Sequence, residues 1–169
     1  FGDLILLCVK MFENHPDILE LYLNNFKYIL VDEYQDSNYI QSEWLKLLSK
    51  KNNNICCVGD DDQSIYSWRG AEIKNFLDFS KVYKNTKIIR LEQNYRSTQN
   101  ILNAASGLIS KNNDRLGKKL WTDGKDGELV KLTCYKNGRE EATGISDIIE
   151  QKLKKKYSLN NISILVRAI

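Results

Sequence analysis

The chain has 169 residues, of which 42% are hydrophobic and 28% charged, and its formal net charge is +3. This composition excludes an intrinsically disordered chain and suits a globular protein with one well-packed domain or two small ones. No apolar run reaches the roughly 18 residues of a membrane-spanning helix, and no signal-peptide pattern is present, so we expect no membrane association.

The distribution of charge is uneven along the chain. Residues 1–97 carry 12 basic against 14 acidic side chains, whereas residues 98–169 carry 13 against 8. A net charge this small does not by itself indicate a nucleic acid partner. Because the sequence starts at Phe1 rather than Met and ends on an apolar run, we expect it to be a piece of a longer protein.

The cysteines lie in apolar stretches and show no Cys-x-x-Cys spacing, which argues against a zinc site. We expect reduced core thiols in a cytoplasmic protein. The four are Cys8, Cys56, Cys57 and Cys134.

The first elements follow from apolar spacing. Apolar residues recur at helical intervals on either side of His15 and Pro16, which predicts two short helices with His15 as a turn or cap residue. The continuous apolar run 28–31 predicts a buried strand. A helix is expected to open at Ser37, with Trp44 in the core.

Two further strands are predicted at 55–58 and 87–91, with a short helix between them. Alternating strands and helices favour an α/β fold with a parallel sheet, in which polar residues at the strand ends gather at one edge. After a junction near 96–100 we expect a helix from Thr98, a strand at 130–134, a second helix and a strand at 162–166.

The first predicted strand runs directly into Asp32 and Glu33. One carboxylate at such a strand end can hold hydrated Mg²⁺ while its neighbour deprotonates an attacking water, as in Walker B chemistry. In the alternative interpretation, Asp32 only ends the strand while Asp36 or Ser37 caps the next helix.

The second predicted strand leads into a stretch with an amide and interleaved aromatic and basic side chains. Gly59 allows a tight exit from the strand, and Gln63 could bridge a terminal phosphate and a water. Tyr66, Trp68 and Arg69 combine the groups that stack bases and hold phosphates of a single strand. The alternative is that Tyr66 and Trp68 belong to the core.

The third predicted strand leads to Asn94-Tyr95-Arg96-Ser97. Tyr95 could stack on an adenine ring, and Arg96 could reach a γ-phosphate as an arginine finger. Arg96 could equally be a structural ion-pair partner.

Together these segments resemble the UvrD/Rep/PcrA type of superfamily 1 DNA helicases. Val-Asp-Glu-Tyr-Gln-Asp at 31–36 resembles their motif II, the stretch 58–71 their motif III, and Gln-Asn-Tyr-Arg-Ser-Thr at 93–98 their motif IV. Phe-Gly-Asp-Leu at 1–4 resembles the Phe-x-Asp-Leu element ahead of motif II. The resemblance covers nearly the whole chain and is looser after about residue 115.

The resemblance implies a RecA-like fold, with the C-terminal part of a first RecA-like domain at 1–97 and the start of a second at 98–169. It implies an ATP-dependent helicase that moves 3′ to 5′ on DNA, with ATP and Mg²⁺ as cofactors. The implied site residues are Asp32 as Mg²⁺ ligand, Glu33 as base, Gln63 and Arg96 at the γ-phosphate, Tyr95 on the adenine base, and Tyr66, Trp68 and Arg69 on DNA.

The sequence contains no Gly-x-x-x-x-Gly-Lys-Ser/Thr phosphate loop. We therefore expect the 169-residue chain alone to be inactive and to self-associate through an exposed sheet edge. Three alternatives stay open: a helicase-nuclease subunit of the RecB/AddA kind, a nuclease with two metal ions at Asp32, Glu33 and Asp60 to Asp62, and a non-catalytic single-strand DNA-binding module.

Overall fold

The computed structural model describes residues 2–113 and 115–166. Phe1, the first residue of the expected Phe-x-Asp-Leu element, lies outside the described residues. The chain divides into two compact units, Phe1–Gly127 and Glu128–Ile169.

Two helices open the first unit, as predicted. α1 (Gly2–Asn14) is followed by α2 (Pro16–Asn25), and Pro16 stands at the start of α2, where its missing N–H is no loss. His15 connects them: its carbonyl oxygen accepts bonds from the backbone N–H groups of Ile18 and Leu19, both at 3.1 Å. The prediction that His15 is a turn or cap residue is confirmed for its backbone, while its side chain makes no capping bond.

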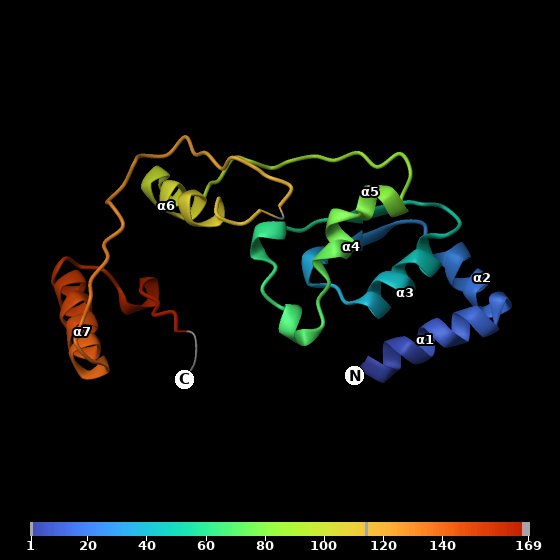
Figure 1. Ribbon diagram of the computed structural model, residues 1–169, viewed down its shortest axis with the longest axis horizontal. Coiled ribbons are helices and arrows are strands. Elements are labelled where there is room, and N and C mark those ends of the chain that lie inside the picture. Colours follow the sequence, from blue (N-terminus) through green and yellow to red (C-terminus); the bar gives the residue numbers. More distant parts are fainter. Residues whose placement is uncertain (1, 114, 167–169) are drawn as a thin grey trace. The chain divides into compact units, whose positions relative to one another are not determined.

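The sheet consists of two short parallel strands, β1 (Ile29–Val31) and β2 (Ile55–Cys57), with Leu30 opposite Cys56 (Figure 1). Bonds beyond the strands extend the pairing, since the Val58 N–H donates to the Val31 carbonyl at 2.8 Å and the Tyr34 N–H to the Val58 carbonyl at 3.0 Å. The residues after both strands are thereby held next to each other.

Helix α3 (Tyr39–Ser49) connects the two strands. It begins at Tyr39 and not at Ser37, because Asn38 forms a capping box in which its side chain and that of Gln41 each accept a bond from the other's backbone N–H, both at 2.9 Å. The alternative in which Asp36 or Ser37 caps this helix is therefore wrong. Ser37 is buried, and its hydroxyl donates to the Tyr34 carbonyl at 2.7 Å.

The core lies where α1, α2 and α3 meet. Phe12, Leu19 and Leu48 form its buried centre, and Trp44 packs against it while staying partly exposed. The other partly buried residues around the centre are Met11, Ile18, Leu23, Ile29 and Leu47. The prediction that Trp44 belongs to the core is thus confirmed, and the residue lies at the edge of the core.

The remaining elements are short, apart from α6 and α7. Single 3₁₀ turns cover Tyr34–Asp36, Asp61–Gln63 and Ser67–Arg69, and the helices α4 (Ile73–Leu77), α5 (Phe79–Val82) and α6 (Gln99–Ile109) complete the first unit. The second unit holds α7 (Gly138–Lys154) and a 3₁₀ turn at Leu159–Asn161.

The predicted strands at 87–91, 130–134 and 162–166 are wrong: these segments have no strand structure. A strand needs a neighbouring backbone for its N–H and C=O groups, and none of the described residues supplies one for these segments. Accordingly Leu91, Leu132 and Leu165 are 80%, 94% and 95% exposed. The segment between α5 and α6 runs without helix or strand (Figure 1).

The expectation of four core thiols is also wrong, because Cys56 and Cys134 are exposed. Leu30, which is 82% exposed, and the exposed Cys56 are paired on one face of the two-stranded sheet. Cys57 points the other way, and burial, with a smaller contribution from Cys56, raises its thiol pKa to about 12.

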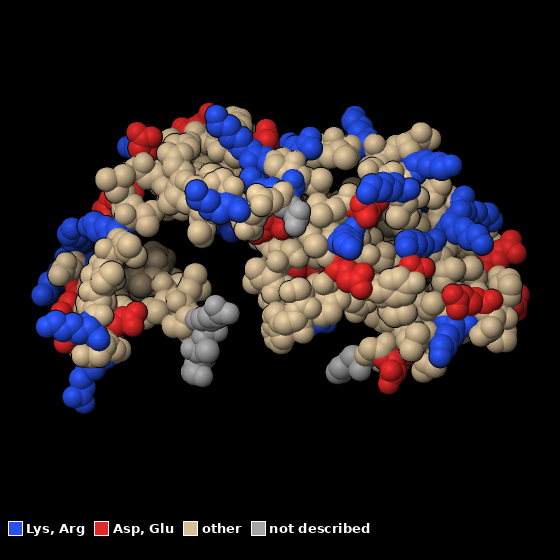
Figure 2. Space-filling view, in the orientation of Figure 1, with Lys and Arg blue, Asp and Glu red and all other residues tan. Residues whose placement is uncertain are grey.

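The surface carries both signs of charge. In the view of Figure 2, Lys and Arg side chains lie on both units with Asp and Glu side chains between them. None of the described helices has the length and apolar character needed to cross a membrane.

Candidate functional site

Asp32 and Glu33 follow β1 directly, and both side chains are exposed. Glu33 has the left-handed backbone conformation, with φ 49° and ψ 41°, which is uncommon for a residue with a side chain and is often found at functional sites. Its N–H donates to Oδ1 of Asp32 at 2.9 Å. The sharp turn brings both carboxylates to the end of the strand.

The two carboxylates lie on a cavity of about 630 Å³ beside β1. Asp36 also lines it, and its Oδ1 is buried without a hydrogen-bond partner among the residues that the structure describes. The walls are mainly apolar and come from α1, β1 and α3, through Ile5, Ile29, Val31, Trp44, Leu45 and Leu48. The cavity thus combines an apolar wall with carboxylates at one end.

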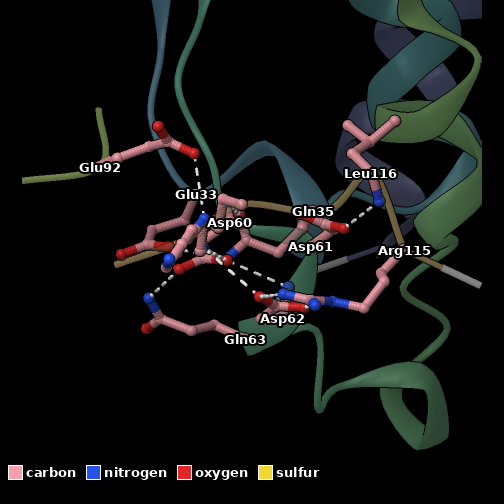
Figure 3. A network of polar contacts seen from close by, with 11 residues as sticks. Glu33, Gln35, Asp60, Asp61, Asp62, Gln63, Glu92, Arg115 and Leu116 are labelled. Carbon is pink, nitrogen blue, oxygen red and sulfur yellow. Dashed lines mark hydrogen bonds and ion pairs between the residues drawn. The ribbon is translucent and has the colours of Figure 1, made fainter. Parts of the chain in front are cut away.

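Gln35 links the ends of the two strands. Its side chain is 1% exposed, its Nε2 donates to Oε2 of Glu33 at 2.7 Å, and its Oε1 accepts from the backbone N–H of Asp60 at 3.0 Å (Figure 3). A buried amide with both ends bonded has a fixed orientation. Sequence reasoning missed Gln35; the available signal was an amide two residues after Glu33 in the turn that ends β1.

Gly59 makes this link possible, for a different reason than the one predicted. Its φ is not positive, so the backbone does not require glycine. A Cβ at this position would lie 2.5 Å from Oε1 of Gln35 and 2.8 Å from Cε2 of Phe76. The glycine is needed for the close approach of Gln35 and not for a tight turn.

Gln63 belongs to the same network through Asp60. Its Nε2 donates to Oδ2 of Asp60 at 2.7 Å, while Oδ1 of Asp60 accepts from the N–H of Asp62 at 3.0 Å. A continuous path of polar contacts therefore runs from Glu33 through Gln35 and Asp60 to Gln63 (Figure 3). The ends of β1 and β2 meet, as the parallel sheet leads one to expect.

Basic residues from much later in the chain cover the acidic turn Asp60–Asp62. Nε and Nη2 of Arg115 donate to the two carboxylate oxygens of Asp62 at 2.8 and 2.6 Å. Lys118 pairs with Asp60 and lies 3.7 Å from Asp62. The Leu116 N–H donates to Oδ2 of Asp61 at 2.7 Å.

The pKa values of these groups follow from the contacts. Burial is the strongest influence on Asp60 and raises its pKa, but the bonds from Lys118 and Gln63 and the Lys118 charge together outweigh it, so that the pKa lies below its ordinary value. The hydrogen bond to Asp62 raises the pKa of Arg115. Lys118 and Gln63 thus favour the ionised form of the Asp60 carboxylate.

The same loop also contacts the segment before Tyr95. Its backbone N–H groups at Lys119 and Trp121 donate to Oε1 and the carbonyl of Glu92 at 3.0 and 3.1 Å. Gln93 donates to Asp123 at 2.7 Å and accepts from the Tyr95 hydroxyl at 2.7 Å.

The structure does not bring Tyr95 and Arg96 to the acidic network. Tyr95 is 86% exposed, Arg96 is exposed, and neither forms a hydrogen bond with Asp32, Glu33 or Gln63 in the described part of the chain. Arg96 also forms no ion pair with a described residue, so the structural ion-pair alternative finds no support here.

Tyr66, Trp68 and Arg69 form a surface cluster. Trp68 is 73% exposed, so the core alternative is wrong for this residue, and Tyr66 is 37% exposed. The Arg69 guanidinium carbon lies 4.6 Å from the Trp68 ring centroid and 5.1 Å from that of Tyr66. Such an arrangement presents aromatic faces and a cation to solvent.

The described residues give no support to the alternative of a nuclease with two metal ions. Within residues 2–113 and 115–166, no three carboxylate, histidine or cysteine side chains gather where they could hold a metal ion. Asp60 and Asp62, which that alternative needs as ligands, are paired with Lys118 and Arg115.

Comparison with known proteins places these residues in a family. Residues 1–84 match the UvrD/REP helicase N-terminal domain, and residues 89–168 match the UvrD-like helicase C-terminal domain. These domains imply a RecA-like α/β fold, consistent with the small parallel sheet and its helices.

Relatives match over 99% of this chain. A probable DNA helicase II homolog of Rickettsia felis is 50% identical, DNA helicase II of Escherichia coli 47%, and the ATP-dependent DNA helicase PcrA of Staphylococcus epidermidis 48%. The matched region is 26%, 23% and 23% of these relatives, so the chain spans about a quarter of their length. The two family domains match consecutive parts of the sequence, and the relatives match nearly all of it. The chain therefore belongs to the UvrD-like DNA helicase family.

Proposed function

We propose that this chain is part of an ATP-dependent DNA helicase that couples ATP hydrolysis to 3′–5′ movement on single-stranded DNA and to duplex unwinding. The path of contacts Glu33–Gln35–Asp60–Gln63 is the observation that carries this proposal, because it joins a water-activating carboxylate to a phosphate-sensing amide. The names of the relatives, DNA helicase II and PcrA, support DNA as the substrate. DNA repair or replication is the proposed setting.

Asp32 and Glu33 have the properties that hydrolysis needs. Asp32 is an exposed carboxylate at the strand end, and Mg²⁺ in such sites is held by one or two carboxylates, by water and by substrate phosphates. When bound, Mg²⁺ neutralises charge on the phosphates. Glu33, held by the Gln35 amide, accepts the proton of the attacking water.

The other roles are assigned by the family pattern. Gln63 contacts the γ-phosphate, Tyr95 stacks on adenine, and Arg96 approaches the γ-phosphate as a finger. The exposure of Tyr95 and Arg96 leaves both available to a nucleotide. We further propose that residues 1–97 end a first RecA-like domain and residues 98–169 begin a second. The two family matches support a division into two domains, although the first ends at 84 and the second begins at 89, earlier in the chain than this bound.

The partners follow from the same proposal. Tyr66, Trp68 and Arg69 contact single-stranded DNA, repair proteins recruit the enzyme, and its location is the cytoplasm. Exposed apolar residues at the two-stranded sheet support self-association of the isolated chain, with Tyr28 and Leu30 80% and 82% exposed.

The test is DNA-stimulated ATP hydrolysis by a full-length protein that contains this sequence. Glu33→Gln removes the base, and we expect kcat to fall by about 100-fold or more. Glu43→Gln, at a half-buried position of α3 paired with Lys46, is the matched control and should retain wild-type turnover. Equal kcat values for wild type and Glu33→Gln would refute the assignment.

The 169 residues by themselves should not hydrolyse ATP, because they lack a phosphate-binding loop. Robust turnover by the pure 169-residue chain, stimulated by DNA and lost in Glu33→Gln, would contradict this expectation.

A single-strand DNA-binding module is the second candidate, favoured by the exposed Trp68–Arg69 pair. Titration with an oligonucleotide at low salt should quench tryptophan fluorescence, and Trp68→Ala should remove most of the change. Trp44 and Trp121 supply the background signal, which the variant isolates. An unchanged signal in the wild type argues against DNA contact at this cluster.

A further inference from the structure

We propose that Arg115 and Lys118 are positioning residues for ATP hydrolysis: they hold the acidic turn Asp60–Asp62 and, through Asp60, the amide of Gln63. This inference rests on the proposed function and adds to it a link between distant parts of the chain. The acidic turn lies in the region matched by the N-terminal family domain, and both cations lie in the region matched by the C-terminal one.

Asp60 is the centre of the link. One of its oxygens, Oδ1, pairs with Lys118, and the other, Oδ2, accepts from Nε2 of Gln63 at 2.7 Å. Because both oxygens belong to one rigid carboxylate, Lys118 fixes the direction from which the Gln63 amide is held. Gln63 itself is exposed, so no packing fixes its amide in place of this bond.

Asp62 and Arg115 secure the rest of the turn. Their side chains are 13% and 19% exposed, and the guanidinium binds both carboxylate oxygens, which sets geometry as well as charge. Three consecutive carboxylates in one turn repel one another, and the two cations offset that repulsion. Without them the 3₁₀ turn that carries Gln63 is expected to open.

The covering loop also contacts the segment that leads to Tyr95 and Arg96. Directly after Lys118, the backbone N–H groups of Lys119 and Trp121 bind Glu92, and the Asn94 N–H donates to the Trp121 carbonyl at 2.7 Å. Glu92 and Asn94 precede Tyr95 and Arg96 in the chain. The segment 115–121 therefore holds both the turn of Gln63 and the approach to Tyr95 and Arg96.

The experiment compares Arg115→Ala and Lys118→Ala with Lys125→Ala in a full-length protein that contains this sequence. Lys125 is an exposed lysine of the same loop region, and its side chain forms no ion pair with any residue the structure describes. We expect kcat for DNA-stimulated hydrolysis to fall about tenfold in the first two variants, while KM for ATP changes less than about twofold, as for a loss of positioning. Lys125→Ala should match the wild type.

Rescue separates a positioning role from a structural one. The exchange Asp62→Arg with Arg115→Asp keeps the pair and should recover most of the lost kcat, whereas Arg115→Lys keeps the charge but loses the fork and should recover only part. Lowered kcat with unchanged KM and rescue by the exchange support the inference.

Two results overturn the inference alone: wild-type kcat in Arg115→Ala and Lys118→Ala, or losses that the exchange does not restore and that parallel a fall in melting temperature. Absence of DNA-stimulated hydrolysis in the wild type instead refutes the proposed function on which the inference depends.

Discussion

Gly59 is the residue whose side chain, a single hydrogen, leaves room for the link between the two strand ends. In Gly59→Ala the new methyl group would meet Gln35 at 2.5 Å and Phe76 at 2.8 Å. The buried amide would have to move and lose its bonds, so we expect the free energy of unfolding to fall by about 1–3 kcal/mol. Urea denaturation measures the change.

Gly107 provides the matched control for this substitution. It lies inside α6, and a Cβ added there would meet no atom within 4 Å outside its own stretch of helix, so Gly107→Ala should stabilise the chain by about 0.5–1 kcal/mol. If both glycines respond alike to alanine, Gly59 has no special packing role.

The stability of the folded protein depends on pH through Asp60. Its pKa in the folded protein lies below the ordinary value of 3.8, so the unfolded chain takes up this proton first as the pH falls. The stability that Asp60 contributes is complete above the unfolded pKa and is lost as the pH falls through the lower, folded pKa. Asp60→Asn should therefore lower the melting temperature at pH 7, with a difference that shrinks below about pH 4.

Lys118→Met tests the cause of that dependence. It removes the cation that lowers the Asp60 pKa, and the melting temperature should then respond less to acid over the same range. A difference between wild type and Asp60→Asn that is constant from pH 7 to strongly acidic solution would disprove the linkage.

Some residues of the site could be predicted from the sequence, because they belong to a local pattern. Others could not, because their contacts come from distant parts of the chain. Asp32 and Glu33 follow an apolar run, so their place at a strand end could be predicted locally. Arg115 binds Asp62 across 53 residues, and no local pattern predicts such a pair. Gln35 could not be recognised as a site residue from the sequence, because the space for its side chain depends on Gly59, which follows the neighbouring strand.

At the scale of elements, α3 offers a test of helix capping. Asn38→Ala removes a side chain that accepts the Gln41 N–H at 2.9 Å, and the free energy of unfolding should fall by about 1 kcal/mol. Gln41→Ala removes the reciprocal bond. Because the two bonds form one box, the double variant should lose less than the sum of the single losses in urea denaturation. Strict additivity would show that the bonds act independently.

Helices were predicted better than strands, since a helix satisfies its backbone within one segment. The apolar spacing before residue 27 and after Thr98 was sufficient to predict α1, α2 and α6. The segment 87–91 has the composition of a strand, but it has no partner among the described residues. Composition alone does not provide that partner.

At the scale of the whole molecule, the two-stranded sheet leaves apolar side chains open to solvent. Leu30 is 82% exposed, and we expect the isolated chain to dimerise at micromolar concentrations or above through this region. Leu30→Lys should shift light scattering towards the monomer. Leu132→Lys, at a 94% exposed position of the second unit, is the control and should leave the mass unchanged. A wild type that remains monomeric at all concentrations contradicts the expectation.

The ion pair between Asp62 and Arg115 also has a consequence for folding kinetics. Its partners are 53 residues apart, so the chain must close a long loop before the pair can form, and contacts of this kind tend to form after the folding transition state. A contact made late affects mainly the unfolding rate. Removing the pair, as in Arg115→Ala, should therefore raise the unfolding rate while leaving the refolding rate almost constant.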